Sequence, residues 1–388
     1  MNRSNRLRLL TIALAGAGVL TPLNASAQLA DFSAQGASGN RGGGAVFVMT
    51  NDANHNEVIA FDRNSNGYLT ERGDYDTGGR GSGGVTDPLE SQGSLTLSQD
   101  HSLLFAVNAG SGTVSVFKVF SSSLFLLDKT PTGGSQPVAV AQRNNLVYVL
   151  NSGGAGSVVG FRLNFGGQMQ PIKKSTAFLT GNTTAGASLA FSPDGQFLLV
   201  TERLANTIDA FRVKPDGTLG PLVANENPAP GTFSLAFASN GKVIVSETGP
   251  AGASNASATS SYTVGADGKL TAVSQSVPAL AAGNCWNAIT PDGTRVYTSN
   301  SGSDSISGYN IAKDGTLTPI ASTVVGNNPA GSHNVDIAVT ADGKFVYTIN
   351  SDSGEVGEFR VEQDGRLTSL GQAGQLPKSV GFNGIAAL

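Results

Sequence analysis

Cysteine, histidine and tryptophan are scarce in this sequence. Among 388 residues there are one Cys, three His and one Trp. A lone cysteine, Cys285, excludes an internal disulfide framework, and three scattered histidines do not have the spacing of a zinc site. Gly-rich phosphate loops and the Gly-x-Ser-x-Gly motif are also absent. We therefore expect no metal and no cofactor, and a fold stabilised by a large apolar core.

Charge is low as well. Only 13% of the residues are charged, and 24 Lys and Arg against 28 Asp and Glu give a formal net charge of −4. Three of the basic residues lie within the first eight positions, so the rest of the chain is more acidic still. Nucleic acids and anionic membranes attract basic surfaces. We expect neither as a partner.

The N-terminus has the pattern of an export signal. Three arginines precede an apolar stretch at 9–20, and a small-x-small sequence ends at Ala27. About a dozen apolar residues are too few to span a bilayer as a helix. We expect a signal peptide over 1–27, a flexible Gly/Ser-rich segment over 28–44, and a periplasmic or secreted protein without a membrane span. An uncleaved anchor is the alternative.

The rest of the chain is repetitive. Four segments of the type x-Ala-apolar-x-x-Asx-Gly align, at 189–195, 235–241, 287–293 and 337–343. Two looser copies lie at 95–100 and 138–144. Successive copies are about 45 to 50 residues apart, which is the period of β-propeller blades rather than of helical solenoids.

Each copy predicts four antiparallel strands. An apolar strand follows the first Asx-Gly turn, and a polar loop, an alternating strand, a second Asx-Gly turn and a short strand come next. Asx-Gly between alternating apolar runs is a strong hairpin signal. The first copy has three strands, and an orphan strand remains at 382–388. Joining the two predicts an all-β, seven-bladed β-propeller over 45–388, closed by the C-terminal strand.

One column of the repeat has a small residue in every innermost strand. Its members are Thr96, Ala139, Ala190, Ala236, Ala288, Ala338 and Ala386. Two residues earlier the chain reaches the same face of the strand, and there Trp286 and Asp336 replace the Ser, Pro or Gly of the other copies. Because departures from a structural repeat often mark function, we expect a small-molecule site at this mouth of the channel. A simple plug is the alternative for Trp286.

Loops at the same mouth supply further candidates. Glu202 and Glu247 replace Asn as the first loop residue in two neighbouring blades, and Arg203 follows directly. His333, Asn334 and Asn284 precede the two unusual inner strands, and His55 lies in the loop of blade one. We expect catalytic roles for Glu202, Asp336, His333 and Arg203, and ligand-binding roles for Trp286, Asn284, Asn334, Glu247 and His55. The alternatives are a Glu202 that only pairs with Arg203 and a His55 that is merely solvated.

The blade sequences at 190–202, 206–211 and 216–219 resemble the seven-bladed lactonase family, which includes 6-phosphogluconolactonases and carboxymuconate cycloisomerases. The resemblance extends over nearly all of 45–388. It implies that Glu202 matches the family's functional Glu. The family's His and Arg fall near Gln136 and Ala187, neither of which is basic.

A lactonase needs a base for water and a cation for the developing oxyanion. Glu202 with Arg203, or His333 with Asp336, would supply such a pair. The resemblance thus predicts a hydrolase or isomerase of a lactone or related small organic acid. The alternative is a non-catalytic propeller with a degenerate lactonase site, which binds a ligand at its mouth or a protein through its rim.

Overall fold

The computed structural model describes residues 43–181, 185–251 and 253–388. The expected signal peptide (1–27) and nearly all of the expected N-terminal segment (28–44) lie outside the described residues. In the described part, no helix has the length and apolar character needed to cross a membrane. A single 3-10 turn, η1 (Ser301–Ser303), is the only helical element described there.

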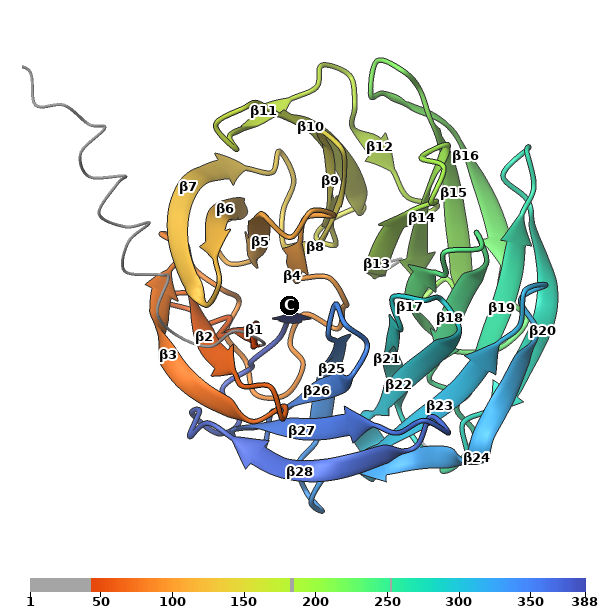
Figure 1. The fold of residues 1–388 in the computed structure, drawn as a ribbon. Helices are drawn as coiled ribbons and strands as arrows, with labels where there is room; N and C mark the ends of the chain where they lie inside the picture. Colours follow the sequence, from red (N-terminus) through yellow and green to blue (C-terminus); the bar gives the residue numbers. More distant parts are fainter. Residues whose placement is uncertain (1–42, 182–184, 252) are drawn as a thin grey trace, which may run out of the picture. The chain divides into compact units, whose positions relative to one another are not determined.

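Seven antiparallel sheets are arranged in a ring around a central axis (Figure 1). This confirms the predicted seven-bladed all-β propeller. Blade one contains β29 (Ile385–Ala387), β1 (Gly44–Met49), β2 (Glu57–Arg63) and β3 (Leu69–Asp76). Blade two contains β4 (Leu95–Leu97), β5 (Leu103–Asn108), β6 (Thr113–Phe120) and β7 (Ser123–Pro131). Blade three contains β8 (Pro137–Arg143), β9 (Leu146–Asn151), β10 (Ser157–Leu163) and an outer edge split into β11 (Met169–Pro171) and β12 (Ala177–Phe178).

The other four blades repeat the same order from the channel outward. Blade four contains β13 (Gly186–Phe191), β14 (Phe197–Glu202), β15 (Thr207–Val213) and β16 (Leu219–Glu226). Blade five contains β17 (Thr232–Phe237), β18 (Val243–Glu247), β19 (Ala258–Val264) and β20 (Leu270–Pro278). Blade six contains β21 (Asn284–Ile289), β22 (Arg295–Asn300), β23 (Ser305–Ile311) and β24 (Leu317–Asn327). Blade seven contains β25 (Asn334–Val339), β26 (Phe345–Asn350), β27 (Glu355–Val361) and β28 (Leu367–Ala373).

The last strand closes the ring, as the orphan segment predicted. β29 pairs with β1 and completes blade one, with Ala386 opposite Phe47. The C-terminus therefore lies near the centre of the ring (Figure 1). The Leu388 amide also donates to the Ala45 carbonyl at 2.8 Å. A closed ring leaves no unpaired inner edge between its first and last blades.

Buried tyrosines form hydrogen bonds from one blade to the next. In blade six the Tyr297 hydroxyl donates to the Gly365 carbonyl of blade seven at 2.9 Å. Tyr347 of blade seven makes the same bond to Gly67 of blade one at 2.7 Å. Each acceptor is the glycine of an outer hairpin turn, where φ is positive, at +88° in Gly365. The Asx-Gly turns thus contribute a hydrogen-bond acceptor as well as a reversal of the chain.

The connection between β3 and β4, residues 77–94, crosses the channel mouth, and we call it the crossing segment. It hydrogen-bonds to the starts of three inner strands: Ser91 Oγ donates to Val138 (2.9 Å), Gln92 N to Ala187 (2.9 Å), and Trp286 Nε1 to Ser91 (2.8 Å). Thr86 reaches Asp352 of blade seven at 2.9 Å. The mouth where the inner strands begin is therefore covered.

Candidate functional site

Asp336 lies at a β-bulge in the innermost strand of blade seven. The pairing of β25 with β26 shifts between Val335 and Ile337, so Asp336 is the extra residue, with φ at +58°. Its side chain is 2% exposed. Within the described residues, its carboxylate accepts hydrogen bonds from two backbone amides, Ile337 at 2.8 Å and Ile385 at 3.1 Å. Burial raises the pKa of Asp336 to about 7.

The crossing segment adds two acidic residues beside Asp336. Asp87 accepts a hydrogen bond from Asn383 Nδ2 at 2.6 Å. Burial raises the pKa of Asp87 well above its usual value, and the negative charges of Glu90 and Asp336 raise it further. Arg203 opposes this shift. We call Asp87, Glu90, Asp336 and Arg203 the mouth cluster.

Arg203 is held by the crossing segment. Its guanidinium forms an ion pair with Glu90, and its backbone amide donates to the Ala185 carbonyl at 3.0 Å. Nε of Arg203 is buried without a hydrogen-bond partner among the described residues. The guanidinium therefore retains a donor that a ligand oxygen in the mouth cluster can use.

Trp286 lies under the crossing segment. It is 1% exposed, and its ring meets Phe233 edge-on with 5.2 Å between the ring centroids. The preceding residue, Cys285, is buried, and burial raises the pKa of its thiol. The thiolate of Cys285 is therefore disfavoured. Trp286 is positioned to sense any movement of Ser91, which accepts its indole N–H.

Asn284 and Asn334 occupy equivalent positions and face the preceding blade. Asn284 Nδ2 donates to Ala258 at 2.6 Å, and Asn334 Nδ2 donates to Ser299 Oγ at 2.6 Å. Both residues are fully buried. Their amides connect blades five and six and blades six and seven, respectively, and the structure does not bring them into the mouth cluster.

Glu202 is also directed between blades. It is fully buried, and Thr180, which follows blade three, donates to it from its backbone amide at 2.8 Å and from its hydroxyl at 2.7 Å. Asp209 of β15 lies on the same face of the sheet and is also fully buried. Burial and the charge of Glu202 raise the pKa of Asp209 to about 9. Asp209 therefore holds a proton at neutral pH.

Asp209 was not among the candidates. A sequence signal was present, since Asp209 is an acidic residue between the apolar residues Ile208 and Ala210 of a strand. Its place relative to Glu202 follows only from the pairing of β14 with β15, in which Asp209 is opposite Val200.

Glu247 repeats the position of Glu202 in the next blade. Its carboxylate accepts from Ser260 Oγ at 2.6 Å and from Asn227 Nδ2 at 3.2 Å. Burial raises its pKa, and these hydrogen bonds oppose the shift. Asn108 of blade two, with Asn at the same position, accepts from Thr77 Oγ1 at 2.7 Å. The first loop residue therefore serves the junction between blades, whether it is Asn or Glu.

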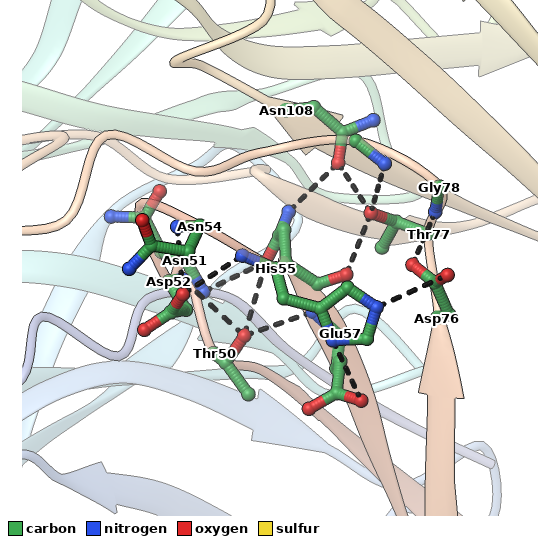
Figure 2. A network of polar contacts seen from close by, with 12 residues as sticks. Thr50, Asn51, Asp52, Asn54, His55, Glu57, Asp76, Thr77, Gly78 and Asn108 are labelled. Atoms are coloured by element: carbon green, nitrogen blue, oxygen red, sulfur yellow. Dashed lines mark hydrogen bonds and ion pairs between the residues drawn. The ribbon is translucent and has the colours of Figure 1, made fainter. Parts of the chain in front are cut away.

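The two candidate histidines lie in loops, with His55 exposed and His333 half-buried. His333 Nδ1 is 3.8 Å from Asp352 Oδ2, and the His333 amide donates to Asp304 at 2.7 Å. In Figure 2, His55 lies between two carboxylates, with Nε2 3.1 Å from Asp76 and Nδ1 3.3 Å from Glu57. The hydrogen bond to Asp76 raises the pKa of His55. Neither imidazole makes a contact with Asp336 in the described structure.

The mouth cluster can perform acid–base chemistry. A carboxyl group with a pKa near 7 can exchange a proton with a reactant close to neutral pH, and a guanidinium can stabilise developing negative charge. In the described part of the chain, no three His, Cys, Asp or Glu side chains form a metal-binding group.

Comparison with known proteins agrees with this architecture. Residues 263–383 match the family model "Lactonase, 7-bladed beta-propeller". This confirms the resemblance to the seven-bladed lactonase family. The search of curated proteins found no match.

Several solved structures are similar over most of the chain. A proposed 6-phosphogluconolactonase from Bacteroides uniformis has 20% identity and a TM-score of 0.67, covering 90% of this chain and 100% of that one. A second from Bacteroides fragilis has 20% identity and a TM-score of 0.68, with coverages of 90% and 98%. A periplasmic gluconolactonase from Pseudomonas aeruginosa has 16% identity and a TM-score of 0.65, with coverages of 89% and 99%. At these identities the likeness is one of fold.

Proposed function

Because the chain is a seven-bladed propeller that resembles the lactonase family, we propose that it is an exported lactone hydrolase with its site in the mouth cluster. The observation that carries the proposal is Asp336, a buried carboxyl group with a pKa of about 7. The charges of Asp336 and of Arg203 both act on Asp87. Perturbed carboxyl groups of this kind concentrate at functional sites. The family match and the lactonase-type relatives favour a lactone over other esters.

In the proposed reaction Asp336 is the general base. Its carboxylate takes a proton from a water molecule as the water oxygen attacks the lactone carbonyl. Arg203 donates to the oxyanion of the tetrahedral intermediate. The ring C–O bond then breaks, and the proton held by Asp336 passes to the departing ring oxygen. The products are a carboxylic acid and an alcohol on one chain, and the enzyme is unchanged.

This reaction requires movement of the crossing segment. Asp336 and Trp286 are 2% and 1% exposed, so a substrate reaches them only after the Glu90 region lifts. The exposed ion pair between Glu90 and Arg203 is the contact to break. Lifting would also release the Arg203 guanidinium for the substrate oxyanion.

The test is a panel of γ- and δ-lactones, assayed with the wild type and Asp336→Asn. Loss of an acid–base group typically lowers kcat/KM by about 100-fold or more, while Asn keeps the shape and the acceptor oxygen for one backbone amide. Asp314→Asn, in an exposed Asx-Gly turn where Asp314 accepts from Thr316, is the matched control and should keep full activity. Full activity in a folded Asp336→Asn protein would remove Asp336 from the mechanism.

A non-catalytic binding propeller is the second candidate. Glu202, which matches the family's functional Glu, is engaged by Thr180 and Asp209 between blades. The two positions where the family has basic residues are Gln136 and Ala187, and the Ala187 carbonyl is bound by the crossing segment. A wild type that is inert toward the whole lactone panel would favour this reading.

Export and domain boundaries are part of the same proposal. The arginine-rich, apolar and small-x-small pattern supports a signal peptide over 1–27, followed by a linker to residue 44 and the propeller over 45–388. Mass spectrometry of the purified periplasmic protein would locate the first residue of the mature chain, which we expect to be Gln28.

A further inference from the structure

A cavity of about 290 Å³ lies in the channel on the other side of the crossing segment. Gln92 and Gly93 of the crossing segment line one part of it. The rest is lined by the inner strands of blades two to five and by the turns that follow some of them, among them Thr96, Gln99, Gln142, Arg143, Ser188 and Ala190. The cavity therefore opens at the face opposite the mouth cluster.

Arg143 brings a positive charge to this cavity. It is half-buried at the end of β8, and its guanidinium has no hydrogen bond or ion pair within the described residues. The charge of Arg143 lowers the pKa of Asp194, but that carboxylate is already engaged by Ser192 Oγ at 2.6 Å and the Gln196 amide at 3.0 Å. The N–H donors of the Arg143 guanidinium are thus available to bind a carboxylate.

Neutral polar groups line the same cavity. The Ser188 hydroxyl makes no hydrogen bond to the described chain, and Thr96 Oγ1 donates to Gly93, which leaves its lone pairs for an incoming donor. Gln99 accepts from the Asn144 amide at 3.1 Å, so its NH2 group remains to donate. Ala190 and Leu235 supply apolar surface.

We infer that this cavity binds a small hydroxylated monocarboxylate, with the carboxylate on Arg143 and the hydroxyl groups on Ser188, Thr96 and Gln99. Arg143 is the one charged side chain in the lining, and its guanidinium can accommodate a single carboxylate. A dicarboxylate would bury a second charge without a partner, which is costly. The volume is at the lower end for ligand pockets and suits a compact metabolite.

This site is separate from the mouth cluster and does not depend on the proposed function. The side-chain amide of Gln92 makes two hydrogen bonds with the backbone of Asn287. Its Nε2 donates to the Asn287 carbonyl at 2.6 Å, and its Oε1 accepts from the Asn287 amide at 3.2 Å. The crossing segment therefore stands between the cavity and Trp286. A ring-opened lactone is itself a hydroxylated monocarboxylate, so the cavity suits the class of product that lactone hydrolysis gives.

Calorimetric titration of the full mature chain with gluconate tests the inference. We expect saturable binding at one site, and Arg143→Gln should weaken it by about 10-fold or more because a charge-assisted bidentate contact is lost. Arg366→Gln is the matched control, since Arg366 lies on an exposed outer turn near Asp364, and it should bind as the wild type does. Ala190→Leu should block binding by filling the cavity, and circular dichroism checks that each variant is folded.

Two further ligands test the chemical class. Sorbitol has the hydroxyl groups without the charge, and butyrate has the charge without the hydroxyl groups, so both should bind more weakly than gluconate. No binding of gluconate, equal binding by a folded Arg143→Gln protein, or equal binding of sorbitol would overturn the inference. Because these experiments measure binding, they test the inference independently of lactone turnover.

Discussion

The buried carboxyl groups of Glu202 and Asp209 lie on the same face of blade four, and the charge of Glu202 raises the pKa of Asp209. In blades two, five and six the residue matching Asp209 is a serine, Ser115, Ser260 or Ser307. Blade four alone has two acids at this junction among those four blades. We therefore expect the stability of blade four to depend on the proton that Asp209 holds.

The first prediction concerns this proton. The folded-state pKa of Asp209 is raised to about 9, from 3.8, so between these values the folded chain holds a proton that the unfolded chain releases. The free energy of unfolding therefore falls as pH rises through this window. Asp209→Asn supplies a permanent donor to Glu202. We expect it to match the wild type at pH 5 and to melt about 2 °C or more higher at pH 9.

The control for that experiment is Asp216→Asn, an exposed turn residue that accepts from the Thr218 amide. The difference in melting temperature between this variant and the wild type should stay the same across this pH range. A difference between Asp209→Asn and the wild type that does not grow with pH would mean that the pair is not protonated in the folded chain.

The second prediction concerns the tyrosine bonds between blades. Tyr297→Phe keeps the packing but leaves the Gly365 carbonyl without its donor. A buried polar group that loses its partner costs about 1–2 kcal/mol of the free energy of unfolding. Urea denaturation measures this loss. Tyr68→Phe, on an exposed tyrosine, should cost nothing measurable.

The third prediction concerns ring closure. Deleting residues 382–388 removes β29 and exposes β1 as an inner edge. We expect a lower melting temperature and self-association, because open strand edges pair with other chains. Size-exclusion chromatography with light scattering measures the association. A monomeric truncated chain with unchanged melting temperature would contradict the role of β29 as the closing strand.

The fourth prediction concerns the crossing segment. Glu90→Gln removes the ion pair with Arg203, which should let the segment lift more often from the buried Trp286. Acrylamide should then quench the single tryptophan more strongly than in the wild type. Glu57→Gln, at the His55 contact on the outer surface, should leave quenching unchanged. Equal quenching in all three proteins would show that Glu90 does not hold the segment down.

The blade repeat was sufficient to predict the ring and its closure. Asx-Gly turns and alternating apolar residues are local signals. The turns predict hairpins, and the alternation predicts strands such as β26. The seventh blade followed from counting strands at both ends. These features depend on short stretches of sequence, so a single sequence reveals them.

The candidate site was less accessible to sequence. The alternation of side chains along a strand assigns Asp336 to one face of the sheet. A β-bulge at Asp336 interrupts this alternation. The path of the crossing segment is set by hydrogen bonds to residues such as Ala187 and Asn287, far away in sequence. Its length was the available signal, because a connection of about 15 residues or more without regular structure is often functional.

The pH dependence of lactone hydrolysis tests the central claim most directly. If Asp336 is the base, kcat/KM of the wild type on any lactone it opens should rise with pH and level off above an apparent pKa of about 7, because the free carboxylate is the active form. Asp336→Asn should lose both the activity and this inflection, with its fold intact by circular dichroism. A wild-type profile that is flat between pH 5 and 8.5, or an Asp336→Asn protein that keeps the inflection, would contradict the account.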